Sequence, residues 1–187
     1  MRLTKETVIQ TAADIADKDG LGGVSLRAVA EKLAIRTPSL YNHIDNLDGL
    51  LREMAHRGMR EMNARMLQAA VGRSGDAAIK AVSVAYLEYM IAHPGVYETI
   101  QWALWHGSAE TAEIFEQYKS LLVKLILSCR LKNPDTGEIL PLLTGFLHGY
   151  CTMQLGKAIK NPEGAVRGLE MALDTVLLGI HGTYGQG

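Results

Sequence analysis

The stretch from Ser25 to Leu51 constrains the fold of this 187-residue chain more than any other. It reads SLRAVAEKLAIRTPSLYNHIDNLDGLL, and its first apolar residues follow the i, i+3, i+4, i+7 spacing of one helix face. Residues 34–36 are then predicted to form a tight turn. Thr37 is predicted to cap a short helix whose first position is Pro38, where a missing N–H costs nothing. Two short helices joined by a tight turn have the layout of a helix-turn-helix motif.

The rest of the chain also has an all-α pattern, because it contains neither hairpin turns between alternating apolar runs nor clusters of β-branched residues. We predict a three-helix helix-turn-helix domain in residues 1–50, followed by a helical ligand-sensing and dimerisation domain in residues 51–187. The last residues, 181–187, are rich in glycine and predicted to fray. About nine helices are expected, over residues 4–18, 25–33, 37–43, 47–71, 76–92, 96–105, 109–131, 136–159 and 163–180. Thr4 and Ser25 are predicted to cap the first two.

Composition limits the function only loosely. Apolar residues make up 48% of the chain and the net charge is −1, so no overall basic field indicates a nucleic-acid partner. The N-terminal part is slightly basic and the remainder slightly acidic. The N-terminus has no apolar signal segment, and the uncharged stretch 139–156 is too short and too polar to span a membrane. We therefore expect a cytoplasmic protein without a membrane partner.

The residues of the second short helix suggest how it would meet DNA. Leu40 and Ile44 would hold it from beneath. Thr37 and Ser39 would reach base edges through hydroxyl or methyl groups. Tyr41 and His43, like the N–H groups that open helices, suit phosphate oxygens. The alternative is a three-helix bundle that makes no DNA contact and leaves Tyr41 and His43 as half-buried surface residues.

At these residues the chain resembles the TetR family of bacterial transcriptional repressors. The family motif, a small cap followed by Leu-Tyr-x-His-Phe, a charged turn and Leu-Leu, is matched here by residues 37–44 and 45–51, and the resemblance covers residues 4 to about 55. It implies a ligand-responsive regulator that leaves a pseudo-palindromic double-stranded DNA operator when a small apolar or aromatic effector binds. With Arg36 added as a cation close to the turn, the DNA-contact candidates are Ser25, Arg27, Arg36, Thr37, Pro38, Ser39, Tyr41 and His43.

Two positions depart from the family motif. Ile44 stands where the family has an aromatic residue, and Leu47 stands where it has a lysine that touches phosphate. Arg36 or Arg52 would compensate in part for that lysine. We call the helix-turn-helix of residues 25–51 the head. We therefore predict that a single head binds DNA weakly and that function depends on two heads acting together.

The two C-terminal helices carry apolar stripes that resemble the a and d positions of helices packing at a shallow angle. Repeated on a second subunit, they would form a four-helix homodimer interface, as in the TetR family. The alternative is that both stripes face only the core of their own subunit. The predicted interface residues are Phe146, Gly149, Tyr150, Met153, Val166, Leu169, Leu173, Val176 and Ile180.

Aromatic residues gather in the middle of the chain and predict a cavity for a small-molecule effector. The run Trp105-His106-Gly107 also resembles a C-terminal subclass of the TetR family. The alternative is that these side chains simply fill the core. A bound ligand would shift the helix over residues 47–71, which carries the reading head. The predicted ligand residues are Tyr86, Tyr89, Met90, Trp102, Trp105, His106, Phe115 and Tyr118.

An enzyme is the main rival class, and the sequence argues against it. It contains no G-x-S-x-G, P-loop, H-E-x-x-H or paired-cysteine motif. The six histidines show no i, i+3 or i+4 pairs for a metal, so we expect neither a metal nor a cofactor. The remaining alternative is a helical protein-interaction module, or a small-molecule-binding protein without operator binding.

Overall fold

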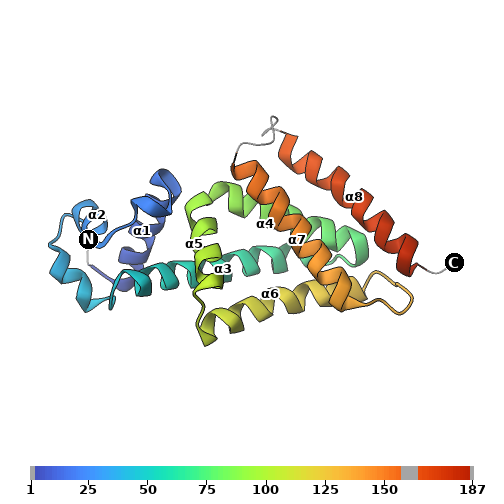
Figure 1. Ribbon diagram of the computed structural model, residues 1–187, viewed down its shortest axis with the longest axis horizontal. Coiled ribbons are helices and arrows are strands. Elements are labelled where there is room, and N and C mark those ends of the chain that lie inside the picture. The colour runs from blue at the N-terminus through green and yellow to red at the C-terminus, as the bar shows by residue number, and fades with distance from the viewer. Residues whose placement is uncertain (1–2, 157–163, 186–187) are drawn as a thin grey trace. The chain divides into compact units, whose positions relative to one another are not determined.

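The computed structural model describes residues 3–156 and 164–185, and over these ranges the chain is all-α, as predicted (Figure 1). The segment 157–163, where one predicted helix ends and the next begins, lies outside the described residues, as do the last two residues of the tail. The described residues form α1 (Lys5–Asp19), η1 (Leu21–Gly23), α2 (Leu26–Lys32), η2 (Thr37–Asn42), α3 (Leu47–Ala70), α4 (Gly75–Ala92), α5 (Pro94–Trp105), α6 (Ala109–Leu127), α7 (Thr136–Leu155) and α8 (Ala165–Tyr184), where η marks a 3₁₀ helix.

These elements divide into two compact units, each described by itself below. Unit 1 holds the residues up to Glu61 together with His93–Ile114, and unit 2 holds Met62–Ala92 and the residues from Phe115 onward. The long helices α3 and α6 each contribute to both units. The boundary predicted after residue 50 concerns functional domains and stays a prediction.

Unit 1 is built around α1, whose apolar face packs against α5 (Figure 1). Thr4 caps α1 as predicted, because its side chain accepts a hydrogen bond from the backbone N–H of Thr7. Val8, Ala12 and Ile15 form the buried stripe that the helical spacing predicts. The N-terminal elements therefore rest on a core that includes α5.

The joint between α1 and α5, the α1–α5 clamp, combines close packing with hydrogen bonds. Gly95 lies so close to Ala16 that a Cβ on Gly95 would overlap the Ala16 backbone. Asp17 Oδ1 accepts from the backbone N–H groups of Gly95 at 2.9 Å and Val96 at 3.1 Å, and its Oδ2 lies 3.0 Å from His93 Nδ1. The Asp17 carboxylate thus holds the first N–H groups of α5, which no carbonyl within that helix can reach.

A second joint in unit 1 connects α3 with the start of α6. His56 of α3 is only 2% exposed, and its Nε2 lies 2.8 Å from Thr111 Oγ1. Its Nδ1 lies 3.5 Å from a carboxylate oxygen of Glu110. Burial lowers the pKa of His56, and this effect outweighs the nearby Glu110 carboxylate, which raises it. His56 is therefore held in its neutral form.

Unit 2 places α8 against α4 and α7. Leu169, Leu173 and Ile180 point into the unit and are buried. Two polar contacts flank this apolar seam: Lys80 Nζ lies 2.8 Å from Asp174 Oδ1, and His181 Nε2 lies 2.9 Å from the Asp76 carboxylate. Each pair joins α4 to α8.

Three helix ends differ from the sequence predictions. The helix after the turn begins at Thr37, with Arg36 in the capping position, and is a single 3₁₀ segment, because six residues containing Pro38 form few i→i−4 hydrogen bonds. α6 ends at Leu127, before Arg130 and Asn133, which have positive φ. The last helix does not fray at 181 but continues to Tyr184, whose hydroxyl donates to Glu138 at 2.6 Å.

The clamp predicts the effect of one added methyl group. Gly95→Ala should destabilise unit 1 by about 1–3 kcal/mol, because the Cβ overlaps backbone rather than a movable side chain. Gly22→Ala is the matched control, since nothing lies within 4 Å of a Cβ there, and it should change stability by less than about 0.5 kcal/mol. Urea unfolding measures both. Equal stability of the two variants would show that the close contact is absent in solution.

Burial of His56 predicts a pH-dependent contribution to stability. Because its pKa is lower in the folded chain than the ordinary value of 6.5, the unfolded chain binds more protons below that pH, and stability is lost as the pH falls through the folded pKa. Wild-type stability should therefore drop more than that of His56→Gln between about pH 7.5 and about pH 5.5 in urea unfolding. Parallel pH profiles for wild type and His56→Gln would contradict the assignment.

Candidate functional site

The turn between α2 and η2 is set by local hydrogen bonds. Ser25 caps α2, since its Oγ accepts from the Ala28 backbone N–H at 3.1 Å. After α2 the chain reverses at Ala34, a non-glycine residue with φ of 57°. The N–H groups of Ala34 and Ile35 close the end of the helix on the carbonyls of Glu31 and Ala30. This conformation brings η2 back into contact with α2 and completes a helix-turn-helix.

Two apolar residues hold η2 in place from beneath, as predicted. Leu40 is fully buried and Ile44 is 6% exposed. The Leu40 carbonyl accepts from the backbone N–H groups of His43 at 2.8 Å and Ile44 at 3.1 Å. Tyr41, between them, is 56% exposed. Side chains on the outer side of η2 are therefore offered from a fixed base.

The other predicted DNA-contact residues lie on the surface of this head to differing degrees. Arg27, Arg36 and Pro38 are exposed, whereas Ser25, Thr37, Ser39 and His43 are half-buried. Arg27 Nε lies 2.7 Å from Glu31 Oε1 in an exposed i,i+4 ion pair, which solvent weakens.

The start of α3 lies directly after this surface. Asn46 Oδ1 accepts from the Gly49 backbone N–H at 2.7 Å and so caps the helix. Leu47 is half-buried, and Asp45 and Asp48 on either side of it are exposed. The helix opening therefore carries no basic side chain, and the weak single head stays a prediction.

The predicted effector residues of unit 2 form an aromatic cluster. The rings of Tyr86 and Tyr118 lie 6.3 Å apart between centroids, and those of Phe115 and Tyr118 lie 5.5 Å apart. Tyr89 is 1% exposed, and the Arg65 guanidinium lies 5.1 Å from its ring centroid. Burial raises the pKa of the Tyr118 hydroxyl, which stays protonated as a hydrogen-bond donor. Met90, also predicted, is fully buried.

The other predicted effector residues belong to the end of α5 in unit 1. Trp102 stacks on His106 with 5.0 Å between ring centroids, and His106 Nδ1 lies 2.9 Å from the Trp102 carbonyl. Trp105 is 85% exposed, so core filling does not explain it. The eight predicted residues thus divide between the two units.

The predicted dimer residues divide by burial. Leu169, Leu173 and Ile180 pack within their own subunit, so their part of the stripe serves the core. Phe146, Gly149, Tyr150, Val166 and Val176 are half-buried, and Met153 is 52% exposed. Sequence spacing missed two other exposed apolar side chains of α8, Met171 and Leu178, while Leu142, at a position of the predicted α7 stripe, is exposed as well.

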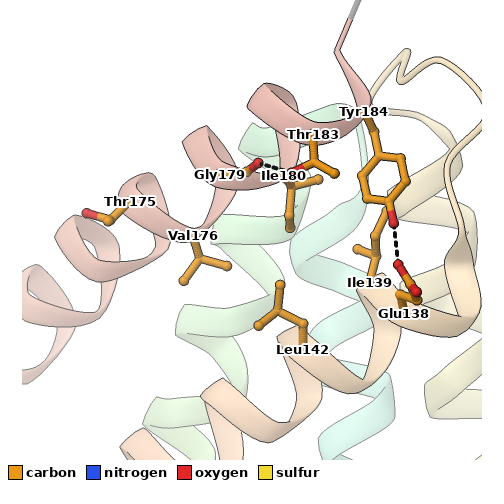
Figure 2. Close-up of a pocket in the computed structure, with 9 residues that line it drawn as sticks. All are labelled: Glu138, Ile139, Leu142, Thr175, Val176, Gly179, Ile180, Thr183 and Tyr184. Atoms are coloured by element: carbon orange, nitrogen blue, oxygen red, sulfur yellow. Dashed lines mark hydrogen bonds between the residues drawn. The ribbon is translucent and has the colours of Figure 1, made fainter.

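Between α7 and α8 these helices leave an open groove of about 400 Å³ (Figure 2). Ile139, Leu142, Val176 and Ile180 supply its apolar lining, and the Tyr184–Glu138 hydrogen bond closes one end. A Cβ at Gly145, Gly149, Gly179 or Gly182 would meet nothing within 4 Å. This face therefore has open space beside small residues.

No group of three or more His, Cys, Asp or Glu side chains in residues 3–156 and 164–185 is arranged to hold a metal ion. Among the helices described, none is both long and apolar enough to cross a membrane.

Most of the chain matches known proteins. The family described as Tetracyclin repressor-like, C-terminal domain, matches residues 79–176. The helix-turn-helix regulator YobS of Bacillus subtilis is 31% identical over 95% of this chain and 93% of its own length. A helix-turn-helix transcriptional repressor of Streptomyces coeruleorubidus is 28% identical over 82% of this chain and 54% of its own.

Solved structures show the same fold. A transcriptional regulator from Rhodococcus sp. Rha1 superimposes with a TM-score of 0.78 at 17% identity, covering 99% of this chain and 100% of the other. TetR from Acinetobacter baumannii AYE gives 0.71 at 18% identity over 96% and 97% of the two chains. The matching family, the full-length relative and the fold agree with the motif at residues 37–51, and the chain belongs to the TetR family of ligand-responsive, DNA-binding transcriptional regulators.

Proposed function

We propose that this protein is a homodimeric repressor that holds a pseudo-palindromic operator with two copies of the η2 head and releases it when a small apolar or aromatic effector binds. The observation that carries the proposal is the head itself. Leu40 and Ile44 are buried beneath η2, while Tyr41 and the adjoining polar side chains face outward. A rigid base with an exposed polar rim is what base and phosphate contacts require.

The roles within the head follow from reach and chemistry. Thr37 and Ser39 at the start of η2 approach base edges, where a hydroxyl donates or accepts. Tyr41 and His43 donate to phosphate oxygens, and the exposed Arg27 and Arg36 add charge. Since Asp45 and Asp48 flank the opening of α3, one head binds weakly. Two heads on one operator add their free energies, so dimerisation supplies the affinity.

The dimer forms through α7 and α8. Leu142, Met153, Met171 and Leu178 are between 51% and 73% exposed, and a second copy would bury them. Open glycines on both helices let a partner helix approach closely. The groove of Figure 2 is continuous with this face and would be filled by the partner's side chains.

The effector binds at aromatic residues, and the two units offer separate candidates. In unit 1 the exposed Trp105 and the stacked Trp102–His106 pair offer flat aromatic surface at the end of α5. In unit 2 the cluster of Tyr86, Phe115 and Tyr118 offers apolar rings around a buried hydroxyl that stays protonated. Aromatic walls favour a planar apolar ligand. The effector can release DNA only by binding the released conformation more tightly.

The operator prediction concerns Thr37 and Tyr41. Replacing either with alanine in both heads of the dimer should weaken binding to DNA taken from upstream of the gene by about tenfold or more, which is about 1.4 kcal/mol. Leu127→Ala is the matched control, since Leu127 at the end of α6 is 58% exposed and Tyr41 is 56% exposed. Gel shifts at several salt concentrations measure this, and wild-type affinity should fall steeply with salt. If both variants bound the operator as tightly as wild type, η2 would not be the element that contacts DNA.

The dimer prediction concerns exposed apolar residues of α8. Met171→Glu and Leu178→Glu should raise the dimer dissociation constant at least tenfold, because each places a charge where the partner excludes water. Leu67→Glu, at a 59% exposed position on α3, should leave it unchanged. Sedimentation velocity separates monomer from dimer. A wild-type protein that is monomeric at micromolar concentration would refute the interface.

A further inference from the structure

The short turn between α5 and α6 carries the Trp105-His106-Gly107 sequence and leads directly into a capped helix. Ser108 caps α6, since its Oγ accepts from the Thr111 backbone N–H at 3.2 Å. The two hydroxyls lie 3.2 Å apart, and the Ser108 N–H reaches Thr111 Oγ1 at 3.3 Å. Thr111 is thus tied to the residue that directly follows the turn.

Thr111 is also the partner of His56 on α3, and the pair is buried. Both residues are 2% exposed, and Thr111 Oγ1 lies 2.8 Å from His56 Nε2. One arrangement of hydrogens satisfies every group: Ser108 Oγ–H donates to Thr111 Oγ1, Thr111 Oγ1–H donates to His56 Nε2, and His56 Nδ1 faces the Glu110 carboxylate. Because water does not reach the pair, neither partner can be lost without leaving a buried polar group unpaired.

A second tie runs beside this pair at the surface. The Arg60 guanidinium donates to Glu110, which joins the same two helices. Both side chains are more than half exposed, so water and salt weaken this contact. The buried pair, and not the ion pair, therefore fixes the position of α3 against the start of α6.

His56 lies on α3, the helix that directly follows η2, so the pair can affect the position of η2. His56 lies in the third turn of α3, and the helix begins three residues after Ile44, which is buried beneath η2. A helix transmits displacement along its length because its backbone is hydrogen-bonded throughout. Moving α3 at His56 therefore moves the base on which η2 rests.

The two ends of α5 differ in their freedom. At its beginning the α1–α5 clamp leaves no space, because Gly95 lies directly against the Ala16 backbone. At its other end the exposed Trp105 and His106 lead into the turn. A rearrangement near the tryptophans is therefore passed to Ser108 and Thr111 rather than to α1.

We propose that the His56–Thr111 pair couples the Trp-His-Gly turn to the DNA-reading head, so that effector occupancy at the turn and operator binding at η2 each alter the same buried hydrogen bond. His56 and Thr111 are positioning residues in this scheme and touch neither ligand. The inference rests on the proposed operator-binding function. Since coupling between two sites is reciprocal, operator binding must also be felt at the turn.

The chain provides its own probe, because both of its tryptophans, Trp102 and Trp105, lie in or next to the turn. Saturating the full-length dimer with operator DNA should change the tryptophan emission of the wild-type protein. In His56→Gln and Thr111→Val the emission change should fall to less than half, at DNA concentrations that saturate each variant. Thr111→Ser keeps the hydroxyl and should restore it. Thr99→Val, which removes another buried hydroxyl in unit 1, is the control and should keep the wild-type change.

The outcomes separate the inference from the function on which it rests. A wild-type dimer that binds operator in a gel shift without any emission change overturns the coupling alone. So does an equal emission change in wild type, His56→Gln and Thr111→Val. Absence of operator binding by the wild-type dimer overturns the proposed function and the coupling together. Should His56→Gln fail to fold, the contrast between Thr111→Val and Thr111→Ser decides the question.

Discussion

The contact of Gly95 with the backbone of Ala16 is the constraint on which unit 1 depends. It brings α5 against α1 without an intervening side chain, and that approach lets the Asp17 carboxylate reach the first free N–H groups of α5. Glu98 of α5 accepts from the Leu21 N–H at 2.9 Å and so adds the link before α2 to the same joint. The elements that carry the head therefore pack on the beginning of α5, and the other end of α5 carries Trp102 and Trp105.

Much of the fold could be predicted from sequence because its signals are local. Thr4 and Ser25 cap the helices expected of them, and Leu40 and Ile44 are buried as their spacing requires. The C-terminal stripe could serve the core of its own subunit or a dimer interface, and the burial of Leu169 assigns that residue to the core. Periodicity identifies an apolar face, but it does not say whether that face meets the chain's own core or a second copy.

The two joints could not be predicted, because they depend on residues far apart in the chain. His56 and Thr111 are separated by 55 positions, and Asp17 and Gly95 by 78. Each of these residues is unremarkable within its own helix, so neither spacing nor composition singles it out. Only the packing of α3 on α6 and of α1 on α5 gives them partners.

The chemistry of the His56–Thr111 pair suits a two-state device better than apolar packing would. Apolar contacts are non-directional, whereas a buried hydrogen bond is directional and, once broken, leaves two polar groups without water. The loss costs about 1–3 kcal/mol, and coupling free energies of about that size change affinity between about 5-fold and about 150-fold. For the weak single head predicted from Leu47, no larger change is needed for the protein to leave its operator. The predicted weak heads and the proposed buried switch are therefore matched in free energy.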